Sequence, residues 1–436
     1  MNIRILGGAH EIGGNCVELE SGGQRLLLDL GMPLTAGPDE HIPLPPVAGL
    51  LTGDDPTLHG IVISHGHLDH YGLLRQAHPS VPVFMGEAAA RILAEAAFFM
   101  RDPVVPRPAG FLKDRTPMDI GPFRVTPYLV DHSAFDAYAM LVEADGQRLF
   151  YTGDLRAHGR KSALFDRLVK NPPENIDILL SEATNVRDDA APAAPAMTEG
   201  ELENSFVEAF RATDGLALVA FSVQNIDRLV TIYKAARRSN RELVVDLYAA
   251  TIAKATGCSS IPQPPYDGRG FSNYRVFLPL SQRIRVKTSQ EFDRADWVRD
   301  IRVFHKELAR HPERFVMMFR GSMTGDLRAV NRLGGLADAK AWWSLWKGYL
   351  DEPSGMKLQQ NLASMNVPLE VLHTSGHASV ADLRRLVESI NARETVFLHT
   401  EHPDRARIIC DPKCCPSSGS DAIGAANGHS GRKADR

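Results

Sequence analysis

Short apolar or alternating runs, separated by glycine-rich breaks, fill the first part of the chain. Such runs predict β-strands, because successive side chains of a strand point to opposite faces of a sheet. The predicted strands are residues 2–7, 16–20, 25–30, 60–64, 82–86, 123–130, 138–143, 148–153 and 176–181. The Ala-rich residues 87–99 predict a helix, and residues 71–76 predict the start of another.

The pattern changes beyond residues 187–196, a stretch rich in Asp, Ala and Pro that predicts a linker. Thr198 and Glu201 then have the spacing of a capping box, so we expect a helix through about residue 212. A succession of strands and helices follows, the rhythm of a parallel α/β unit. Its predicted elements are residues 216–222, 224–238, 242–247 and 315–319.

Residues near the C-terminus resemble the first part again. Strands are predicted at residues 367–372 and 395–398, on either side of a helix at 379–391. We therefore expect an α/β fold in which one domain is interrupted by another. The expected division is 1–190 and 361–410 for the outer domain, 191–360 for the inserted domain and 411–436 for a disordered tail.

The bulk composition agrees with a globular protein of more than one core. The 436 residues are 44% hydrophobic and 23% charged. No apolar run has membrane-spanning length and the N-terminus lacks a signal-peptide pattern, so we expect a cytoplasmic protein with no membrane partner. The five cysteines are too scattered for a disulfide framework. The protein has a net charge of -4, so it would need a local basic surface or bound metal to hold a polyanion.

The strongest chemical signal directly follows the predicted strand 60–64. His65, His67, Asp69 and His70 lie within six residues of one another. Imidazole nitrogens and carboxylates are good ligands for zinc and similar ions, whereas a merely solvated polar loop seldom gathers so many. Further candidates follow other predicted strands, namely His132, Asp154 and His399. A lone residue of this kind is more often an ordinary surface or core residue than a metal ligand. All three, however, follow the carboxyl ends of strands, which can converge on one edge of a sheet.

These residues resemble the ordered motifs of the metallo-β-lactamase superfamily. The resemblance implies an αββα sandwich with two divalent ions, Zn²⁺ or alternatively Mn²⁺. It implies that Asp29 supports the ligands from behind and that Asp154 bridges both ions. By the same likeness one ion is held by His65, His67 and His132, and the other by Asp69, His70 and His399.

The large insertion resembles the β-CASP branch of that superfamily, whose members include ribonuclease J. Glu182 in residues 181–185, His377 in residues 375–379 and His399 match its three additional motifs. A histidine at the third motif is typical of RNA-acting members. The resemblance implies an inserted α/β β-CASP domain, a single-stranded RNA substrate, and 5′-to-3′ exonuclease activity with some endonuclease capacity. A DNA nuclease, a small-molecule thioesterase or lactonase, a non-catalytic nucleic-acid-binding platform and a homo-oligomer stay open as alternatives.

Roles for individual side chains follow from phosphodiester chemistry. Asp69 is expected to orient the attacking water, and His377 to contact the phosphate or protonate the leaving 3′-oxygen. Ser379 and Ser322 are candidate phosphate contacts, the latter in a glycine-rich turn. A basic stretch in the insertion is a candidate clamp for a nucleic-acid backbone, although such runs are more often solvated faces. Its members are Arg237, Arg238, Arg241, Arg269, Arg275, Arg283, Arg285 and Lys287. Three tryptophans, Trp342, Trp343 and Trp346, have helical spacing, which predicts packing.

Overall fold

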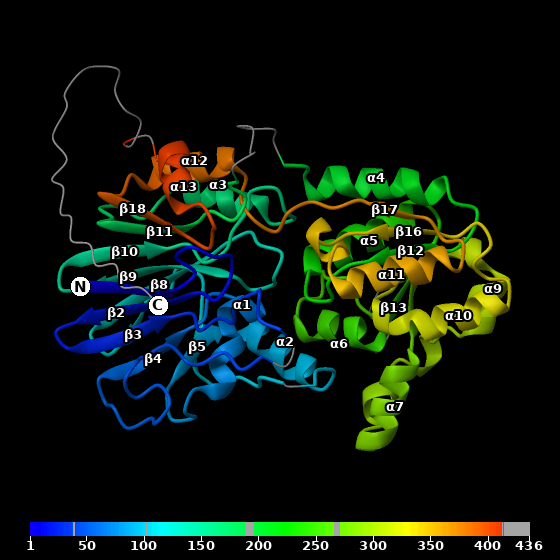
Figure 1. The fold of residues 1–436 in the computed structure, drawn as a ribbon, viewed down its shortest axis with the longest axis horizontal. Coiled ribbons are helices and arrows are strands. Elements are labelled where there is room, and N and C mark those ends of the chain that lie inside the picture. The colour runs from blue at the N-terminus through cyan, green and yellow to red at the C-terminus, as the bar shows by residue number, and fades with distance from the viewer. Residues whose placement is uncertain (38–39, 102, 188–195, 266–270, 412, 414–436) are drawn as a thin grey trace, which may run out of the picture.

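A computed structural model describes residues 1–37, 40–101, 103–187, 196–265, 271–411 and 413 (Figure 1). The predicted linker at 187–196 and the predicted tail at 411–436 lie almost wholly outside the described residues. Among those that are described, no helix is both long and apolar enough to span a bilayer.

Two six-stranded sheets form the first part of the structure. The first sheet has the order β1 (Asn2–Gly7), β2 (Cys16–Ser21), β3 (Gln24–Leu28), β4 (Leu58–Val62), β5 (Val83–Gly86) and β6 (Pro108–Leu112). The second has the order β18 (Glu394–Leu398), β11 (Ile178–Glu182), β10 (Gln147–Tyr151), β9 (Tyr138–Ala144), β8 (Phe123–Leu129) and β7 (Met118–Ile120). The predicted strands of this part are present, and the pattern missed only the β6 and β7 segments of these two sheets.

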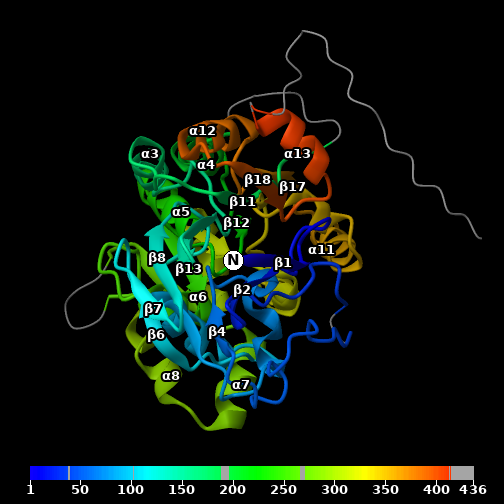
Figure 2. The same ribbon diagram turned by 90° about the vertical axis from the view of Figure 1, so that its left-hand side faces the viewer.

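The alternation of side chains explains how these sheets pack. Inward residues such as Val17, Leu26 and Met140 form a core between the sheets. The outer face of the first sheet is covered by α1 (Leu68–Tyr71), the 3₁₀ turn η1 (Gly72–Gln76) and α2 (Glu87–Ala97). The outer face of the second is covered by α3 (Ser162–Lys170), α12 (Val380–Ile390) and α13 (Pro403–Cys410) (Figures 1 and 2). The predicted αββα sandwich is therefore confirmed.

A third sheet is parallel throughout and is built from residues between 217 and 371. Its order is β14 (Tyr274–Phe277), β13 (Glu242–Asp246), β15 (Phe315–Met318), β12 (Ala217–Ala220), β16 (Lys340–Trp343) and β17 (Leu369–Val371). One face packs on α4 (Glu199–Arg211), α5 (Ile226–Arg238) and α6 (Leu247–Ala255). The other packs on α9 (His305–Arg310), α10 (Thr324–Arg332) and α11 (Pro353–Ala363). The capping box of Thr198 and Glu201 is present at the start of α4.

Two further helices, α7 (Leu280–Ser289) and α8 (Asp293–Asp296), complete this region. The third sheet also takes a strand that we expected in the first part. Residues 369–371 pair with β16, so that Trp343 lies opposite Val371. Hydrophobic pattern alone does not say which sheet a strand joins, because pairing is decided by long-range packing. The exact division into domains stays a prediction.

The three tryptophans do not lie on a helix, and the predicted packing holds for two of them. Residues 340–343 form a strand, in which Trp342 and Trp343 are buried, whereas Trp346 lies beyond the strand and is 49% exposed. Short apolar runs do not distinguish a buried strand from one side of a helix.

Candidate metal centre

Strand ends from both sheets of the sandwich deliver the predicted ligands to one place. The loop after β4 carries His65, His67, Asp69 and His70. The second sheet contributes residues just beyond β8, β10 and β18, which are His132, Asp154 and His399. Their ligand atoms form two groups, each with members within 4.8 Å of one another. One group is His65, His67, His132 and Asp154, and the other is Asp69, His70, Asp154 and His399.

The chemistry of these groups fits divalent metal ions. Every member except His67 is buried. Nε2 of His70, Nδ1 of His132 and both carboxylate oxygens of Asp154 are buried without a hydrogen bond to any residue that the structure describes. Buried polar atoms without a hydrogen bond are costly and rare. Four of them in one place indicate that a binding partner, such as a cation, belongs there. Imidazole nitrogens and carboxylate oxygens are the ligands that zinc and related ions take in proteins.

Asp29 lies behind the His70 ring. Its Oδ2 lies 2.8 Å from Nδ1 of His70 and accepts a hydrogen bond of 2.6 Å from the Tyr151 hydroxyl. Its Oδ1 accepts a hydrogen bond from the backbone N–H of Ser64. With Nδ1 occupied, Nε2 of His70 points to Asp154, 3.2 Å from its Oδ2. A carboxylate behind a ligand histidine fixes the tautomer and the direction of the ring.

Thr184 does the same for His399, a role that the sequence did not reveal. Its hydroxyl lies 2.8 Å from Nδ1 of His399, whose Nε2 is 3.1 Å from Oδ2 of Asp69. Thr184 belongs to the motif at residues 181–185, within which the sequence predicted a role for Glu182 alone. Membership of that motif is the sequence feature that could have indicated a role for Thr184. His399 itself has a left-handed backbone, with φ of 57°, which turns its ring back toward the cluster.

Protonation differs from group to group within the cluster. Burial lowers the pKa of His65 and of His132 well below the ordinary value, and neighbouring imidazoles lower it further, so both are neutral as metal ligation requires. Burial would raise the pKa of Asp154, but His399 and His70 outweigh it and the pKa falls well below its usual range. Burial would lower the pKa of His70, but the Asp154 and Asp29 carboxylates outweigh it and raise that pKa well above the ordinary value, so His70 must lose a proton before it can bind an ion.

Glu182 and His377 lie at the edge of this cluster. Nδ1 of His377 is 3.3 Å from Oε2 of Glu182 and 3.6 Å from Oδ2 of Asp154. Burial would lower the pKa of His377, but the Glu182 and Asp154 carboxylates raise it to about 9. Glu182 is fully buried and its Oε1 also accepts the backbone N–H of Leu155. The His377 side chain is 22% exposed and can therefore be reached from solvent.

The two predicted serines are placed differently from each other. Ser379 is the N-cap of α12, where its hydroxyl accepts from the N–H of Asp382 and donates to Oδ2 of the same residue over 2.7 Å. Ser322 is exposed in the 3₁₀ turn η4 (Gly321–Met323), which follows β15. No contact among the described residues joins Ser322 to the metal cluster.

The basic stretch of the insertion mostly serves internal contacts. The Arg241 guanidinium is buried and donates to the backbone carbonyls of Gly215 and Phe315. Arg275 pairs with Glu242 and Glu307. Arg269, another member, lies outside the described residues. An open clamp made of the whole stretch is therefore the wrong expectation, because sequence shows charges but not the carboxylates and carbonyls that fold against them.

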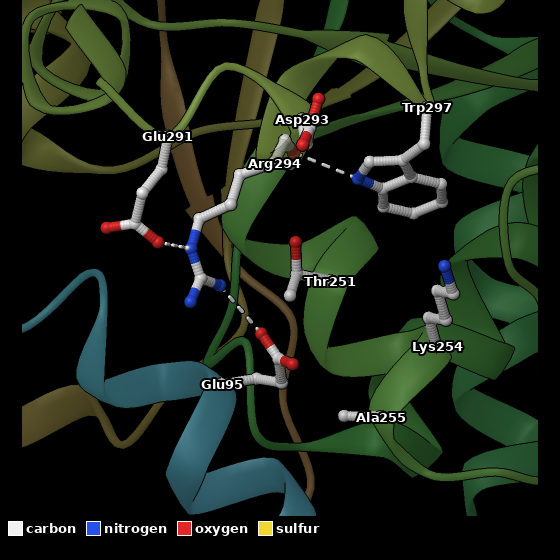
Figure 3. A pocket seen from close by; sticks show the side chains of 8 residues that line it. All are labelled: Glu95, Thr251, Lys254, Ala255, Glu291, Asp293, Arg294 and Trp297. Atoms are coloured by element: carbon white, nitrogen blue, oxygen red, sulfur yellow. Dashed lines mark hydrogen bonds and ion pairs between the residues drawn. The ribbon is translucent and has the colours of Figure 1, made fainter. Parts of the chain in front are cut away.

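A cavity of about 580 Å³ lies between α2 and the α6–α8 region, away from the candidate ligands (Figure 3). Arg294 crosses it to bind Glu95 and Glu291, and Nζ of Lys254 lies 4.6 Å from the centroid of the Trp297 ring. Arg294 thus links α2 of the sandwich to the segment that precedes α8. None of the residues that line the cavity belongs to the two ligand groups.

Comparison with known proteins agrees with this geometry. Residues 25–229 match the family described as "Beta-lactamase superfamily domain". The chain is 28% identical over 249 residues to ribonuclease J of Mycobacterium tuberculosis, an alignment covering 54% of this chain and 42% of that protein. It thus spans about two fifths of that relative. It is 22% identical to ribonuclease J of Pyrococcus abyssi, over 92% of this chain and 90% of the relative.

A solved structure supports the fold over almost the whole chain. The crystal structure of a protein of unknown function from Enterococcus faecalis V583 superposes with a TM-score of 0.72 at 18% identity, covering 92% of this chain and 95% of the other. The paired ligand groups, the αββα sandwich and these similarities agree with one another. In sequence, in its αββα sandwich and in its paired ligand groups, the chain is similar to the metallo-β-lactamase superfamily and to ribonuclease J.

Proposed function

We propose that this protein is a metal-dependent ribonuclease that hydrolyses phosphodiester bonds in single-stranded RNA. The observation that carries the proposal is the pair of ligand groups sharing Asp154, with His377 and Glu182 directly beside them. Similarity to ribonuclease J over most of the chain supports RNA as the substrate. We include 5′-to-3′ exonuclease activity, accompanied by endonuclease activity, and a cytoplasmic location in the proposal.

The proposed ligand set follows the two groups. One divalent ion would be held by His65, His67 and His132. A second would be held by Asp69, His70 and His399. Asp154 contributes to both. Zn²⁺ is the expected ion, with Mn²⁺ as the alternative. When bound, such a pair of ions supplies positive charge to the phosphate oxygens and lowers the pKa of water toward neutrality.

The side chains around the ligands have separate tasks in this proposal. Asp69 orients the attacking water, whose oxygen bonds to phosphorus as the bond to the 3′-oxygen breaks. His377 donates a proton to that leaving oxygen, so the products are a 3′-hydroxyl and a 5′-phosphate. Glu182 positions the His377 ring, and Asp29 positions His70. Phosphate contacts by Ser379 and Ser322 stay predictions, and that of Ser379 requires its hydroxyl to leave Asp382.

The proposal is tested with purified protein, Zn²⁺ or Mn²⁺, and a panel of end-labelled RNA, end-labelled DNA and a thioester. We expect RNA to be cleaved and expect His65→Ala and Asp69→Ala to lose cleavage with an unchanged circular dichroism spectrum. His311→Ala is the matched control, because His311 is exposed beside Glu313 at the far end of the third-sheet region.

Each alternative has its own outcome in this panel. Cleavage of DNA but not RNA would identify a DNA nuclease, and hydrolysis of the thioester alone would identify a small-molecule hydrolase. RNA binding without any cleavage under metal-replete conditions would leave a nucleic-acid-binding platform. Any of these three results overturns the proposed ribonuclease.

A further inference from the structure

Two aromatic side chains lie in the open beyond the end of β16. Trp346 is 49% exposed and Tyr349, in the 3₁₀ turn η5 (Lys347–Leu350), is 37% exposed. Both lie at the carboxyl edge of a parallel sheet, the edge at which α/β proteins bind their ligands. Trp342 fills the core, whereas these two neighbouring rings are both open to solvent at this edge.

The pair is held in one orientation by its surroundings. The six-membered ring of Trp346 rests on Gly348, where any Cβ would overlap it. The backbone carbonyl of Trp346 accepts a 3.0 Å hydrogen bond from the Trp343 indole. The Tyr349 ring meets the Trp346 ring edge-on, with centroids 5.2 Å apart and planes at 89°. The result is a rigid aromatic shelf, defined here as Trp346 and Tyr349.

The shelf is built on the strand next to the one that leads to His377. It follows β16, and β17 is the neighbour of β16 in the sheet. The chain leaving β17 reaches His377 within six residues. The shelf and the loop that carries His377 therefore follow the carboxyl ends of adjacent strands.

A positive charge accompanies the shelf. The guanidinium carbon of Arg187 lies 6.0 Å from the Trp346 ring centroid, and the Arg187 side chain is exposed. Arg187 is two residues beyond Asn185, whose side chain donates to the backbone carbonyl of His377. Exposed aromatic rings beside a cation are what proteins use to stack the bases and hold the backbone of unpaired nucleic acid.

We propose that the aromatic shelf stacks an unpaired nucleobase of the substrate, with Arg187 at the adjoining phosphate. This inference rests on the proposed nuclease function and names the part of the substrate that the enzyme reads. Stacking uses the π-face that every base has, so the shelf favours single strands over duplexes without selecting a sequence. The shelf thereby positions the strand for cleavage at the neighbouring cluster.

The test uses a short, nuclease-resistant 2′-O-methyl oligouridine carrying a 3′ fluorophore, and the same oligomer with one abasic residue at each position in turn. Binding is measured by fluorescence anisotropy with the full chain and bound Zn²⁺. We expect Trp346→Leu to weaken binding of the intact oligomer by roughly 10-fold, within the range for loss of one stacked base. Trp346→Phe, which keeps a ring, should recover most of the affinity.

One abasic position should weaken binding to the unaltered protein by a similar factor and leave binding to Trp346→Leu nearly unchanged, because both changes remove the same stack. Phe304→Leu is the matched control: Phe304 is 63% exposed at the start of α9, which Figure 1 places at the end remote from the sandwich. Its oligomer affinity should not change.

The outcomes separate this inference from the proposed function. A position-dependent abasic effect that disappears in Trp346→Leu, in a protein that fails to cleave RNA, supports the shelf and rejects the ribonuclease. If the protein cleaves RNA, but abasic residues weaken oligomer binding equally in the unaltered protein and in Trp346→Leu, the stacking role of the shelf is rejected and the ribonuclease is not. Failure of the unaltered protein to bind the oligomer also rejects the shelf.

Discussion

The guanidinium group of Arg156 donates a 2.9 Å hydrogen bond to the backbone carbonyl of Ser375, two residues before His377. Arg156 follows Asp154 by two residues, so one side chain ties the segment of the carboxylate that both ligand groups share to the loop that carries His377. It is fully buried and also pairs with Asp227 of α5 at 2.6 Å and with Glu199 of α4 at 3.4 Å. The sandwich, the third-sheet helices and the metal cluster thus meet at one arginine.

Replacing this arginine should be severe for folding. Arg156→Met removes the positive charge and leaves Asp227 and Glu199 buried with less compensation, which costs about 3–5 kcal/mol when a buried pair loses one partner. Urea denaturation followed by tryptophan fluorescence measures the change. Arg385→Met is the matched control, because Arg385 also touches two carboxylates but is half exposed and should cost under about 1 kcal/mol. Equal losses in the two variants would contradict the central role of Arg156.

Asp29→Asn tests how far the carboxylate behind His70 sets metal affinity. Asparagine tolerates the left-handed backbone of this position, where φ is 61°, so the loop should keep its shape. The charge that holds Nδ1 of His70 is lost, and we expect metal affinity to fall about 10- to 100-fold. Competition with a fluorescent zinc chelator measures this affinity. Asp54→Asn, at an exposed aspartate, should leave it unchanged, and an unaltered affinity in Asp29→Asn would refute the expectation.

Thr184→Val should act on one of the two ligand groups. The change keeps the shape of the side chain but removes the hydroxyl 2.8 Å from Nδ1 of His399. His399 belongs to the group with Asp69 and His70, so we expect that group to lose its ion first. Elemental analysis after dialysis against a weak chelator should show metal content falling by half.

Thr184→Ser, which retains the hydroxyl, is the control for this experiment and should keep the metal content of the unaltered protein. A loss of all metal in Thr184→Val, or of none, would contradict separate support for the two groups.

Acid stability should depend on Glu199. Burial would raise its pKa, but Arg228 and Arg156 outweigh burial and lower it to about 2 from the ordinary 4.5. Because the folded-state pKa is depressed, the stabilisation is complete above pH 4.5 and is lost as pH falls from there toward 2. The shift corresponds to roughly 3 kcal/mol at full effect. Urea midpoints between pH 5 and 3 should fall steeply for the unaltered protein and less steeply for Glu199→Gln; parallel slopes would contradict this.

The sequence by itself determined most strands of the sandwich and the candidate ligands. Period-two patterns depend on the two faces of a strand, which are a local property, so β1, β2 and β3 were predicted within two residues of their ends. The dense run from His65 to His70 indicated metal chemistry by composition alone. The order of the later ligands along the chain, through the family resemblance, extended this to His132, Asp154 and His399.

Only the tertiary structure decided which residues support those ligands and which surfaces stay open. Thr184 contacts a histidine 215 residues away, and Arg156 contacts a carbonyl 219 residues away, which no local pattern encodes. Residues 369–371 pair with β16 of the third sheet because long-range packing decides which strands pair. The same packing left Trp346 exposed and turned Arg241 inward, since exposure depends on the neighbours that folding brings and not on the residue type.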